Sequence, residues 1–436
     1  MRTILGLGGL LAGTLLAAEP AGRPVYTLQA CIDLGLAQAA PARNAARDEL
    51  ISQARIGQVR AQLLPQLKAR GSYTRLDEAA AFEFAGESYA MGREDNYTGA
   101  VEVDQLLYSG GSVGAALKAA GLYNEIAQVR VRGVNNELVR DICTGFNAIL
   151  LQDEQVRVQE ASLKQLEELL AQAESRFRQQ TASEFDVLTA RVRVANKRPV
   201  LIAARKQAEL ARESFRSLVH LEPGEFDLAG ELVFEPAGRP LEEWLAIARD
   251  QRPELIELRR FLGMREADIR AEQGGYVPEI RAFAGYAGQN PENGTASAGW
   301  DWGWNAGLTA EWSLFDGALR RNVIREKRLE LDKARETLAD TERKVELEIR
   351  SLYLDLVQAA ETVAASGDTV AEAEKGLAIA RTRYDNGLST YLDYTDANLA
   401  LSIARLTRLQ ALHDHMNARV RLQQASGEGF ETGESK

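Results

Sequence analysis

The chain has 436 residues, of which 45% are hydrophobic and 26% are charged, and its formal net charge is −11 at pH 7. This length suits two or three ordinary domains, and an acidic chain without a basic stripe argues against a nucleic-acid partner. Proline is scarce, at 11 residues, and Ala, Leu, Glu, Gln and Arg crowd the segments between glycine clusters, as is typical of long helices.

The first residues are typical of an export signal. Arg2 supplies a positive charge, Ile4 to Ala18 is a short apolar run, and small residues surround Ala17 and Ala18. The run is shorter than the roughly 20 residues that cross a bilayer, although a buried N-terminal helix is an alternative. We therefore expect a signal peptide over residues 1–18 and no transmembrane helix in the mature protein.

The two cysteines, Cys31 and Cys143, both fall within helical patterns. This placement favours two buried thiols over a disulfide. Cys31 also ends a stretch that superficially matches a lipidation box. No apolar run precedes that stretch directly, so we do not expect Cys31 to be lipidated.

The mature chain repeats itself. Leu107-Tyr108-Ser109-Gly110 returns as Leu314-Phe315-Asp316-Gly317, 207 residues later, and Pro65 returns as Pro278. Such a tandem duplication has to be recognised before any fold is assigned. We assign residues 19–220 to the first repeat, 221–240 to an equatorial linker, 241–426 to the second repeat and 427–436 to a C-terminal tail.

Each repeat is expected to contain one very long helix and two helices of about half its length. The long helices should run from Ser112 to about Gln179 and from Ala318 to about Asp385, each about 100 Å long at about 1.5 Å per residue. The shorter helices are expected at residues 28–64, 184–220, 241–276 and 391–426. Two of them placed end to end match one long helix and supply the partners it needs.

Three prolines fall inside these shorter helices. Pro41 and Pro253 occupy nearly equivalent positions in the two repeats and predict a break in the first shorter helix of each. Pro199 has no counterpart, and it predicts a kink in the helix at residues 184–220.

The turns that end the long helices carry a repeated signature. Ser183-Glu184-Phe185-Asp186 and Thr390-Tyr391-Leu392-Asp393 both predict capping boxes, with a hydroxyl first and an acid three residues later. Gly387 suits a helix C-terminus. Gln180 replaces it in the first repeat, so a different turn is expected there.

Four strands are expected between the helices, at residues 67–76, 97–107, 280–288 and 302–314. In the last one, Trp302, Trp304 and Trp312 lie on an apolar face that alternates with a polar face. Trp304 and Trp312 should be about 26 Å apart along the strand, which nearly matches a membrane band bounded by aromatic girdles. A soluble antiparallel sheet is the alternative interpretation. Polar loops near residues 79–93 and 289–299, the latter with the turn dipeptide Asn293-Gly294, should join the strands.

Four strands cannot close a transmembrane barrel by themselves, because about eight are the practical minimum. Open strand edges in lipid would leave backbone groups unpaired. If the strands span a membrane, several copies must therefore share one barrel, and three copies would supply 12 strands. The predicted fold class is mainly α, with a duplicated half-repeat of long antiparallel coiled-coil helices, four transmembrane strands per chain and a membrane β-barrel part.

An ordered set of short motifs runs through nearly the whole mature chain. Its members are Thr27-Leu28 through Ala37, Leu64-Pro65, residues 107–111, residues 312–317, and residues 383–387 followed by Leu392-Asp393. With the export signal, this duplicated set resembles the TolC-like outer-membrane efflux family. The resemblance implies a homotrimer in outer-membrane lipid, with a 12-stranded barrel and a long periplasmic α-helical tube. It also implies docking onto a periplasmic membrane-fusion adaptor and an inner-membrane efflux pump or ABC transporter.

The resemblance also implies a gate at the tip of the second repeat. It assigns Asp393 and Asp396 to an acidic ring and Tyr384 to a latch, with Gly387 and Ser389 at the same tip. Three residues apart, the two acids share one helix face, and six carboxylates in three copies would favour cations. Capping by Asp393 and packing of the turn by Tyr384 are the alternatives.

The tip of the second repeat departs from that pattern at one residue, and the first repeat has a tip of its own. Ser389 stands where the family has a basic latch residue, so a salt-bridge latch of that type is not expected. Phe177, Ser183 and Asp186 form the tip of the first repeat, where Asp186 is expected to be a cap rather than a pore residue.

No catalytic motif is visible in the sequence, which contains no nucleophile elbow, Cys pair or nucleotide loop. His413 and His415 lie two apart on a helix and make a poor metal pair. The sequence therefore predicts no enzyme, cofactor or metal site, but a passive outer-membrane exit duct for small molecules or polypeptides. A secreted periplasmic coiled-coil scaffold and a porin-like uptake channel are the alternatives.

Overall fold

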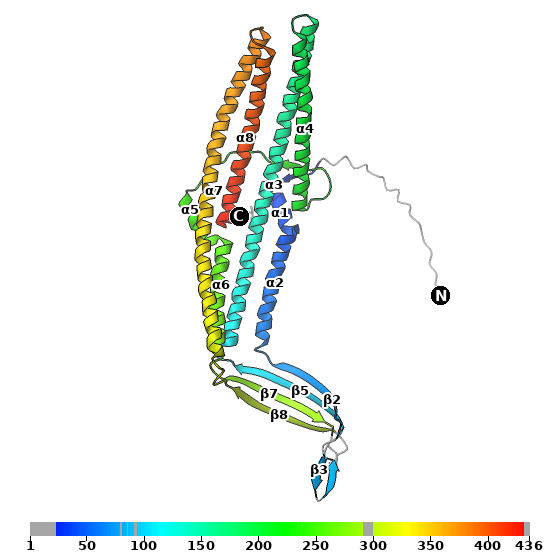
Figure 1. Cartoon of the computed structure of the whole chain (residues 1–436), viewed down its shortest axis with the longest axis vertical. Helices are drawn as coiled ribbons and strands as arrows, with labels where there is room; N and C mark the ends of the chain where they lie inside the picture. Colours follow the sequence, from blue (N-terminus) through cyan, green and yellow to red (C-terminus); the bar gives the residue numbers. More distant parts are fainter. Residues whose placement is uncertain are drawn as a thin grey trace, which may run out of the picture.

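The computed structural model describes residues 23–78, 81–84, 86–90, 94–236, 238–290 and 300–430. The expected signal peptide, the Asn293-Gly294 dipeptide and the tail beyond residue 430 lie outside these residues. The described chain is elongated, with a bundle of long helices at one end and a curved four-stranded sheet at the other (Figure 1).

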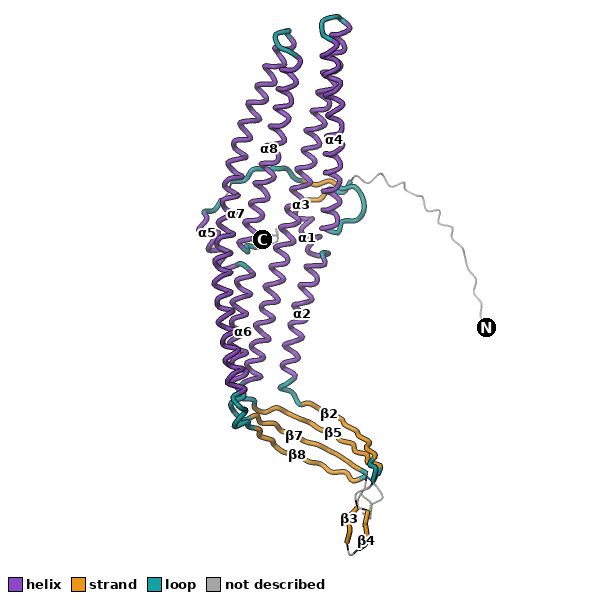
Figure 2. Tube along the Cα trace, in the orientation of Figure 1, coloured by secondary structure: helices purple, strands orange, loops and turns teal. Residues whose placement is uncertain are grey.

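Two helices of 67 residues each form the frame of the molecule. They are α3 (Ser112–Arg178) and α7 (Leu319–Asp385), within one residue of the predicted bounds. Shorter helices accompany them, and these are α1 (Leu28–Gln38), α2 (Ala40–Ala61), α4 (Glu184–Val219), α5 (Leu241–Gln251), α6 (Pro253–Gly274) and α8 (Tyr391–Ser426). In each repeat two sets of shorter helices lie end to end along the long helix, as predicted (Figure 2).

The helices form a wall in which α3 is the central member. Towards the sheet, α3 packs between α2 and α6, and α7 packs on the far side of α6. Towards the opposite end, α3 packs between α4 and α8, and α7 packs against α8. The two repeats therefore meet along α3, and the wall ends in α2 and α4 at one side and in α7 at the other.

Proline sets the predicted helix breaks. The chain is extended at Ala39 (ψ 132°), just before Pro41 in the first turn of α2, and at Arg252 (ψ 120°), just before Pro253 at the start of α6. The first turn of a helix tolerates proline because its N–H groups have no partner within the helix. Pro199 acts differently, since α4 continues through it as one 36-residue helix.

Both cysteines are buried and free, as predicted. Cys31 and Cys143 belong to a core in which α1 packs on α3 beside Phe146 and Phe215. Gly35 permits the close approach, because a Cβ atom there would lie 2.4 Å from the Ile142 side chain. Within the described residues, none of the helices combines the length and the apolar character needed to cross a membrane.

The main sheet has the strand order β2-β5-β7-β8, and every neighbouring pair is antiparallel. Its strands are β2 (Gln66–Arg75), β5 (Asp95–Tyr108), β7 (Glu279–Gln289) and β8 (Asp301–Glu311). The central pair joins β5 of the first repeat to β7 of the second. The outer strands β2 and β8 each keep one edge without a neighbour among the described residues.

The last strand is shorter than predicted, since β8 ends at Glu311 rather than at Leu314. Glu311 faces Glu279, the first residue of β7, so the ladder has no further partner. Trp312 therefore lies just outside the strand, and its Nε1 donates a hydrogen bond to the Tyr276 carbonyl oxygen at 3.1 Å.

The segment expected as a polar loop over residues 79–93 contains a second hairpin. It consists of β3 (Ala81–Phe84) and β4 (Glu87–Ala90), which are antiparallel. Gly86 between them has a φ of +85°, a value that glycine adopts readily. The hairpin projects beyond the sheet, away from the helices (Figure 2). The segment does join the paired strands β2 and β5, but the expected polar loop contains two short strands.

The linker also contains a strand that the sequence analysis missed. β1 (Val25–Thr27) pairs in parallel with β6 (Asp227–Ala229), halfway along the helices. Beside β6, the Phe226 ring packs against Phe215 in the core with a centroid distance of 6.4 Å. A strand of three residues is too short for an alternating pattern to be recognised.

Candidate channel wall and gate

The main sheet has one apolar face. Cross-strand partners share a face, and the pairs Val101↔Tyr286 and Tyr286↔Trp304 place aromatic and aliphatic side chains on the same side. Trp304 is 79% exposed and Leu308 71% exposed. The Trp302 ring stacks on Tyr286 with a centroid distance of 5.3 Å. Such an exposed apolar surface fits contact with lipid.

The opposite face of the sheet is polar. Lys68 on β2 lies 3.6 Å from Asp104 on β5, and Arg70 lies 3.6 Å from Glu102. Asn305 of β8 lies on the same face, because it pairs with Gly285, which in turn pairs with Glu102. The face is therefore polar and charged, as suits a water-filled lumen.

The two edges of the sheet match one another. β2 has 10 residues and β8 has 11, and the strands alternate in direction from β2 to β8. A second copy that placed its β2 beside β8 would continue this antiparallel alternation. An edge inside a membrane has to find such a partner, because lipid offers no hydrogen bonds to the backbone.

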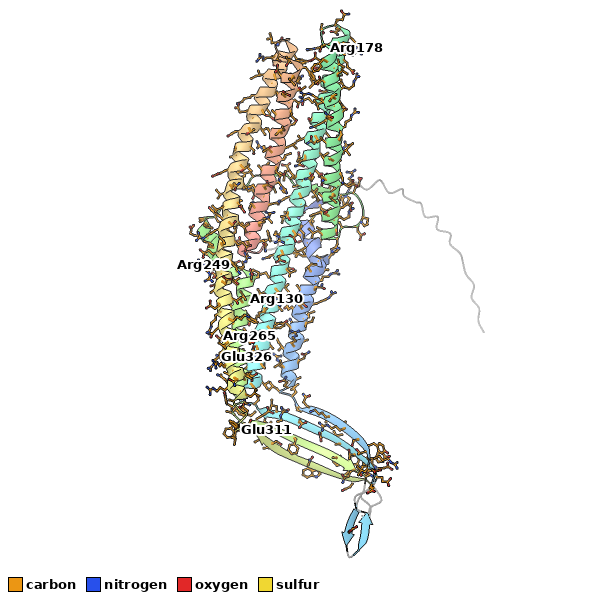
Figure 3. The ribbon with its side chains drawn as sticks, in the orientation of Figure 1. Arg130, Arg178, Arg249, Arg265, Glu311 and Glu326 are labelled. Atoms are coloured by element: carbon orange, nitrogen blue, oxygen red, sulfur yellow. The ribbon has the colours of Figure 1, made fainter. Side chains whose placement is uncertain are left out.

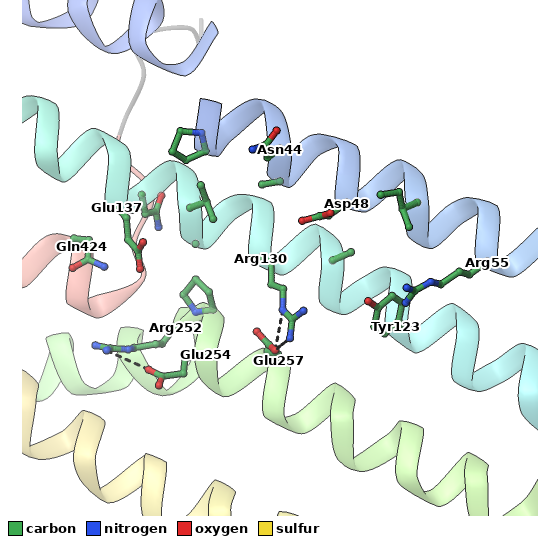
Figure 4. A pocket seen from close by; sticks show the side chains of 18 residues that line it. Asn44, Asp48, Arg55, Tyr123, Arg130, Glu137, Arg252, Glu254, Glu257 and Gln424 are labelled. Atoms are coloured by element: carbon green, nitrogen blue, oxygen red, sulfur yellow. Dashed lines mark hydrogen bonds and ion pairs between the residues drawn. The ribbon is translucent and has the colours of Figure 1, made fainter. Parts of the chain in front are cut away.

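A large groove lies on the helical wall, where the two repeats meet. Its volume is about 780 Å³, and α2, α3 and α6 line it. Figure 4 shows two ion pairs in it: Arg130 binds Glu257, and Arg252 binds Glu254 at 3.4 Å. Arg55 lies over the Tyr123 ring at 4.9 Å. The Arg130–Glu257 pair joins α3 to α6, and the Arg55–Tyr123 contact joins α2 to α3.

The tip of the wall consists of two hairpins, α3–α4 and α7–α8, with the same turn. Gly387 has a φ of +71°, and the Leu388 N–H binds the Arg383 carbonyl oxygen at 2.8 Å. In the first repeat Gln180 has a φ of +60°, and the Thr181 N–H binds the Arg176 carbonyl oxygen at 2.9 Å. The expectation of a different turn at Gln180 was wrong. Closing the last helical turn offsets the roughly 1 kcal/mol that a non-glycine residue costs in this conformation.

Both predicted capping boxes are present. Ser183 and Asp186 cap α4, and Thr390 and Asp393 cap α8. The Asp393 Oδ2 accepts hydrogen bonds from the Thr390 N–H at 2.9 Å and from its hydroxyl at 2.8 Å. These bonds hold the pKa of Asp393 below its usual value. Asp393 therefore acts as a cap, and Asp186 takes the same position in the first repeat.

Tyr384 is buried in a cluster that joins the two repeats. It stacks on Tyr394 with a centroid distance of 5.6 Å and meets Tyr391 edge to face at 6.2 Å. Arg176 of α3 lies over its ring at 4.5 Å. The rest of the cluster comes from α3 and α4 and consists of Leu169, Ala173, Val187 and Ala190. Tyr384 thus packs the tip, the alternative left open by the sequence, and it does so across the repeat boundary.

Burial alters the tyrosines of this cluster. It raises the pKa of Tyr391 to about 12, and it raises the pKa of Tyr384 as well. The Tyr391 hydroxyl is buried without a hydrogen-bond partner among the described residues, and so is the Ser389 hydroxyl. The sequence analysis missed Tyr391 and Tyr394, although their spacing from the Thr390 cap places both in the first turn of α8.

Asp396 has a cationic partner that the sequence analysis did not find. Arg193 of α4 lies 3.3 Å from its carboxylate and forms an ion pair between the two repeats. Ser389, which stands where the resembled family has a basic latch residue, takes no part in this ion pair. A different salt bridge therefore links the two hairpins at the tip. Local spacing could not reveal it, because the partners are 203 residues apart.

Apolar side chains are exposed at the end of the first hairpin. Phe177 closes α3 and is 45% exposed, and Phe185 in the first turn of α4 is 75% exposed. Leu188 follows one turn later and is also exposed. An exposed apolar patch of this kind is a candidate surface for contact with a partner.

The two histidines of α8 have separate environments. His415 is buried against the Phe234 ring at 4.7 Å, and burial lowers its pKa. His413 instead shares hydrogen bonds with Asn417 and Asp414. Over the described ranges, no three His, Cys, Asp or Glu side chains gather as metal ligands would.

A ladder of ion pairs braces the first hairpin. Arginines of α4 meet acids of α3 at every second helical turn, with distances of 2.9, 3.2, 2.6 and 2.6 Å. The pairs are Arg191–Glu174, Arg198–Glu167, Arg205–Glu160 and Arg212–Asp153. Between α7 and α8 the described residues contain one such pair, Arg405–Glu374 at 2.9 Å. The two hairpins are therefore alike in shape and unlike in cross-bracing.

Comparison with known proteins identifies the relatives of this chain. Residues 33–219 and 244–428 match the model of a family described as outer membrane efflux protein. The alkaline protease secretion protein AprF of Pseudomonas aeruginosa is 22% identical over 314 residues. That alignment covers 69% of this chain and 64% of AprF, a little less than two thirds of the relative.

Solved structures share the fold. Crystal structures of CusC superpose with a TM-score of 0.77 at 18% identity and cover 92% of both chains. The CmeC outer membrane channel of Campylobacter jejuni gives a TM-score of 0.77 at 16% identity, with 94% of this chain and 87% of CmeC covered. These likenesses confirm the predicted fold class.

Proposed function

Because the chain belongs to the outer membrane efflux protein family, we propose that three copies form a passive exit duct through the outer membrane. The observation that carries this proposal is the four-stranded sheet, with one apolar face and two complementary free edges. Three such sheets supply 12 strands, which is enough for a closed barrel. The duct makes and breaks no covalent bond in its cargo, and it is not an enzyme.

The helices form the periplasmic part of the duct. Each wall ends in α2 and α4 at one side and in α7 at the other, so neighbouring copies complete a tube by joining unlike edges. Residues 19–220 and 241–426 are the two repeats of this assembly, with 221–240 as the equatorial linker, 427–436 as the tail and 1–18 as the cleaved signal peptide.

The tip is the docking end. A periplasmic membrane-fusion adaptor binds there and connects the duct to an inner-membrane efflux pump or ABC transporter, which supplies the energy. The exposed Phe177, Phe185 and Leu188 support this orientation. The relative AprF is named as a secretion protein and CmeC as an outer membrane channel, so both polypeptides and small molecules are candidate cargo.

The gate is proposed at the tip of the second repeat. Asp393 and Asp396 from three copies form an acidic ring around the axis, and the Tyr384 cluster and the Arg193–Asp396 pair hold the closed hairpins together. Gly387 and Ser389 shape the turn beside them. Trp302, Trp304 and Trp312 mark the aromatic girdles of the barrel.

Block of single channels by a multivalent cation tests the gate. In planar bilayers, wild-type channels should be blocked by a trivalent cation from the tip side, since clustered carboxylates attract it. The double substitution Asp393→Ala and Asp396→Ala should weaken this block at least tenfold. Asp186→Ala removes the equivalent cap in the first repeat and is the matched control, with unchanged block. Equal block in all three proteins would rule out the acidic ring.

A further inference from the structure

The beginning of α7 is strongly basic. The ten residues from Leu319 to Arg328 contain four arginines and one lysine but a single acid, Glu326. Among the described residues, none of these five cationic side chains forms an ion pair, whereas Arg335 further along the helix pairs with Asp332 and Glu266. A cationic surface segment of this kind, free of acidic partners, attracts anions.

Three of these arginines line one groove. Arg321, Arg325 and Arg328 fall on one face of α7, where successive turns bring them together. The groove has a volume of about 540 Å³ and is closed on its other side by Gln273 and Tyr276 at the end of α6. Its floor includes Ile324, which is buried between α6 and α7. A cavity of this size accommodates a small polar headgroup.

The groove lies where the helices meet the sheet. Glu311, the last residue of β8, and Glu326 mark the two sides of this junction in Figure 3. Tyr276 connects the groove to the aromatic girdle, because its carbonyl oxygen accepts the Trp312 Nε1 hydrogen bond and its ring lies 5.4 Å from the Arg320 guanidinium.

Apolar side chains continue from the groove towards the lipid-facing surface. Leu314 is 78% exposed and Phe315 87% exposed, and Leu319 is exposed as well. Large apolar side chains next to a cationic groove match the two ends of a phospholipid. Arginine binds phosphate oxygens in a bidentate manner, while aromatic and aliphatic side chains contact the acyl chains.

A neighbouring copy would not neutralise this groove. In the proposed trimer, α7 faces α2 of the next copy. Between Glu49 and its end at Ala61, α2 carries Arg55 and Arg60 but no acid. The positive charge at the sheet end of α7 therefore persists in the assembly.

We propose that this groove binds the phosphate group of an anionic phospholipid in the periplasmic leaflet of the outer membrane. Arg321, Arg325 and Arg328 hold the phosphate, Tyr276 borders it, and the acyl chains lie over Trp312, Leu314 and Phe315. This inference rests on the proposed placement of the sheet in that membrane. Bound lipid would fix the depth of the barrel and the rotation of α7 at its start.

Native mass spectrometry of the full-length trimer tests the proposal. Delipidated protein in a neutral detergent is mixed with phosphatidylglycerol or with phosphatidylcholine. Wild type should retain phosphatidylglycerol preferentially. At about fivefold per arginine near an anionic lipid, Arg321→Gln, Arg325→Gln and Arg328→Gln together should weaken that binding about a hundredfold. The corresponding lysine variants, which keep the charge but lose the bidentate geometry, should fall in between.

The matched control changes three other basic residues of α7 by the same charge. Arg343→Gln, Arg350→Gln and Arg381→Gln lie far from the sheet, and this variant should bind phosphatidylglycerol as the wild type does. Equal binding of both lipids by the wild type, or equal loss in the control variant, would overturn the proposal. Displacement of phosphatidylglycerol by millimolar inorganic phosphate would assign the groove to free phosphate instead.

Channel measurements separate this inference from the proposed function. In bilayers of phosphatidylcholine, the triple glutamine variant should conduct with the same ion selectivity as the wild type, since the groove faces lipid. Altered selectivity with unchanged lipid binding would place the arginines in the lumen and refute the lipid site. Absence of any channel in the wild type would count against the proposed function itself.

Discussion

At the scale of single residues, two polar side chains at the tip lie in contrasting environments. The Tyr391 hydroxyl is buried without a hydrogen bond among the described residues, while the Asp393 carboxylate accepts two hydrogen bonds from Thr390. A buried hydroxyl without a partner destabilises the folded state, and a bonded cap stabilises it. We therefore expect the protein to tolerate loss of the Tyr391 hydroxyl and to be destabilised by loss of the Asp393 carboxylate.

The first prediction at this scale concerns the effect of removing the Tyr391 hydroxyl on stability. Tyr391→Phe keeps the ring contacts with Tyr384 and deletes a group that has lost its hydration, so the trimer should be as stable as wild type or up to about 1 kcal/mol more stable. Thermal unfolding at pH 7 measures this difference. A loss of more than about 1 kcal/mol would reveal a hydrogen bond that the Tyr391 hydroxyl makes in the assembly.

Alkaline pH gives a second prediction for the same residue. Burial raises the pKa of Tyr391 to about 12, so the folded tip favours the neutral phenol. The free energy of unfolding should be independent of this group below the ordinary tyrosine pKa of about 10 and should fall as the pH rises from there towards 12. Wild type should lose thermal stability over this range more steeply than Tyr391→Phe. Parallel curves for the two proteins would mean that Tyr391 ionises equally in the folded and unfolded chains.

Acid should weaken the cap of α8. Hydrogen bonds from Thr390 lower the pKa of Asp393, so the folded state favours the carboxylate. The contribution of the cap is present above the ordinary aspartate pKa of about 4 and is lost as the pH falls through the lowered value. Asp393→Asn should therefore remove part of the acid sensitivity seen in thermal unfolding between pH 5 and about pH 2. Identical acid profiles in the variant and the wild type would argue against this linkage.

Some of these residues could be predicted from the sequence and others could not. The capping boxes were predictable because they depend on residues three apart. The Arg193–Asp396 pair and the Tyr384 cluster join segments about 200 residues apart, and a single sequence carries no record of such contacts. Gln180 was misjudged, because its neighbours impose a conformation that its own preference disfavours.

At the scale of elements, the helices were predicted better than the strands. Long stretches without proline and the repeated motifs fixed α3 and α7 almost to the residue. The end of β8 was placed three residues too far, because alternation continued in the sequence beyond the last partner on β7. The hairpin β3–β4 and the pair β1–β6 were missed, since strands of three or four residues are too short to show a period.

The ion-pair ladder leads to a prediction about the first hairpin. The side chains of the Arg198–Glu167 rung are 63% and 47% exposed, so this rung contributes only about 0.5 kcal/mol. Arg198→Glu should lower the stability of the α3–α4 hairpin by setting two acids together, and adding Glu167→Arg should restore it. Hydrogen exchange along α3 and α4 measures the effect. If the exchanged pair remained as unstable as the single variant, the contact would not be an ion pair.

The two hairpins should also differ from one another in local stability near the tip. With one cross-pair against four, the α7–α8 hairpin should exchange its amide hydrogens faster near the tip than α3–α4. Raising the salt concentration screens exposed charges and should reduce this difference. The two tips would exchange at equal rates if apolar packing alone determined their stability.

At the scale of the whole molecule, the helical wall and the sheet indicate an assembly of several copies. The outer edges of β2 and β8 have no neighbouring strand among the described residues. The sheet offers an apolar face to lipid, a charged face to water, and two edges that fit one another. The fold class followed from the sequence because the number of strands was countable. The number of copies followed from the family resemblance, since a single chain does not contain its own symmetry.

Cross-linking between strand edges tests whether several copies share one barrel. Within one chain, β2 and β8 are separated by two strands, which puts them about 14 Å apart, too far for a disulfide. Cysteines replace Ser72 on β2 and, one at a time, Gly303, Asn305 or Gly307 on the same face of β8. Cys31 and Cys143 can stay, because burial raises the pKa of each to about 11 and keeps both thiols unreactive.

The protein is oxidised in outer membranes and then separated by denaturing electrophoresis without reductant. At least one β8 position should yield covalent trimers, because β2 of one copy lies beside β8 of the next. Covalent trimers would disappear on reduction. Monomers alone at all three positions would contradict a barrel shared among copies.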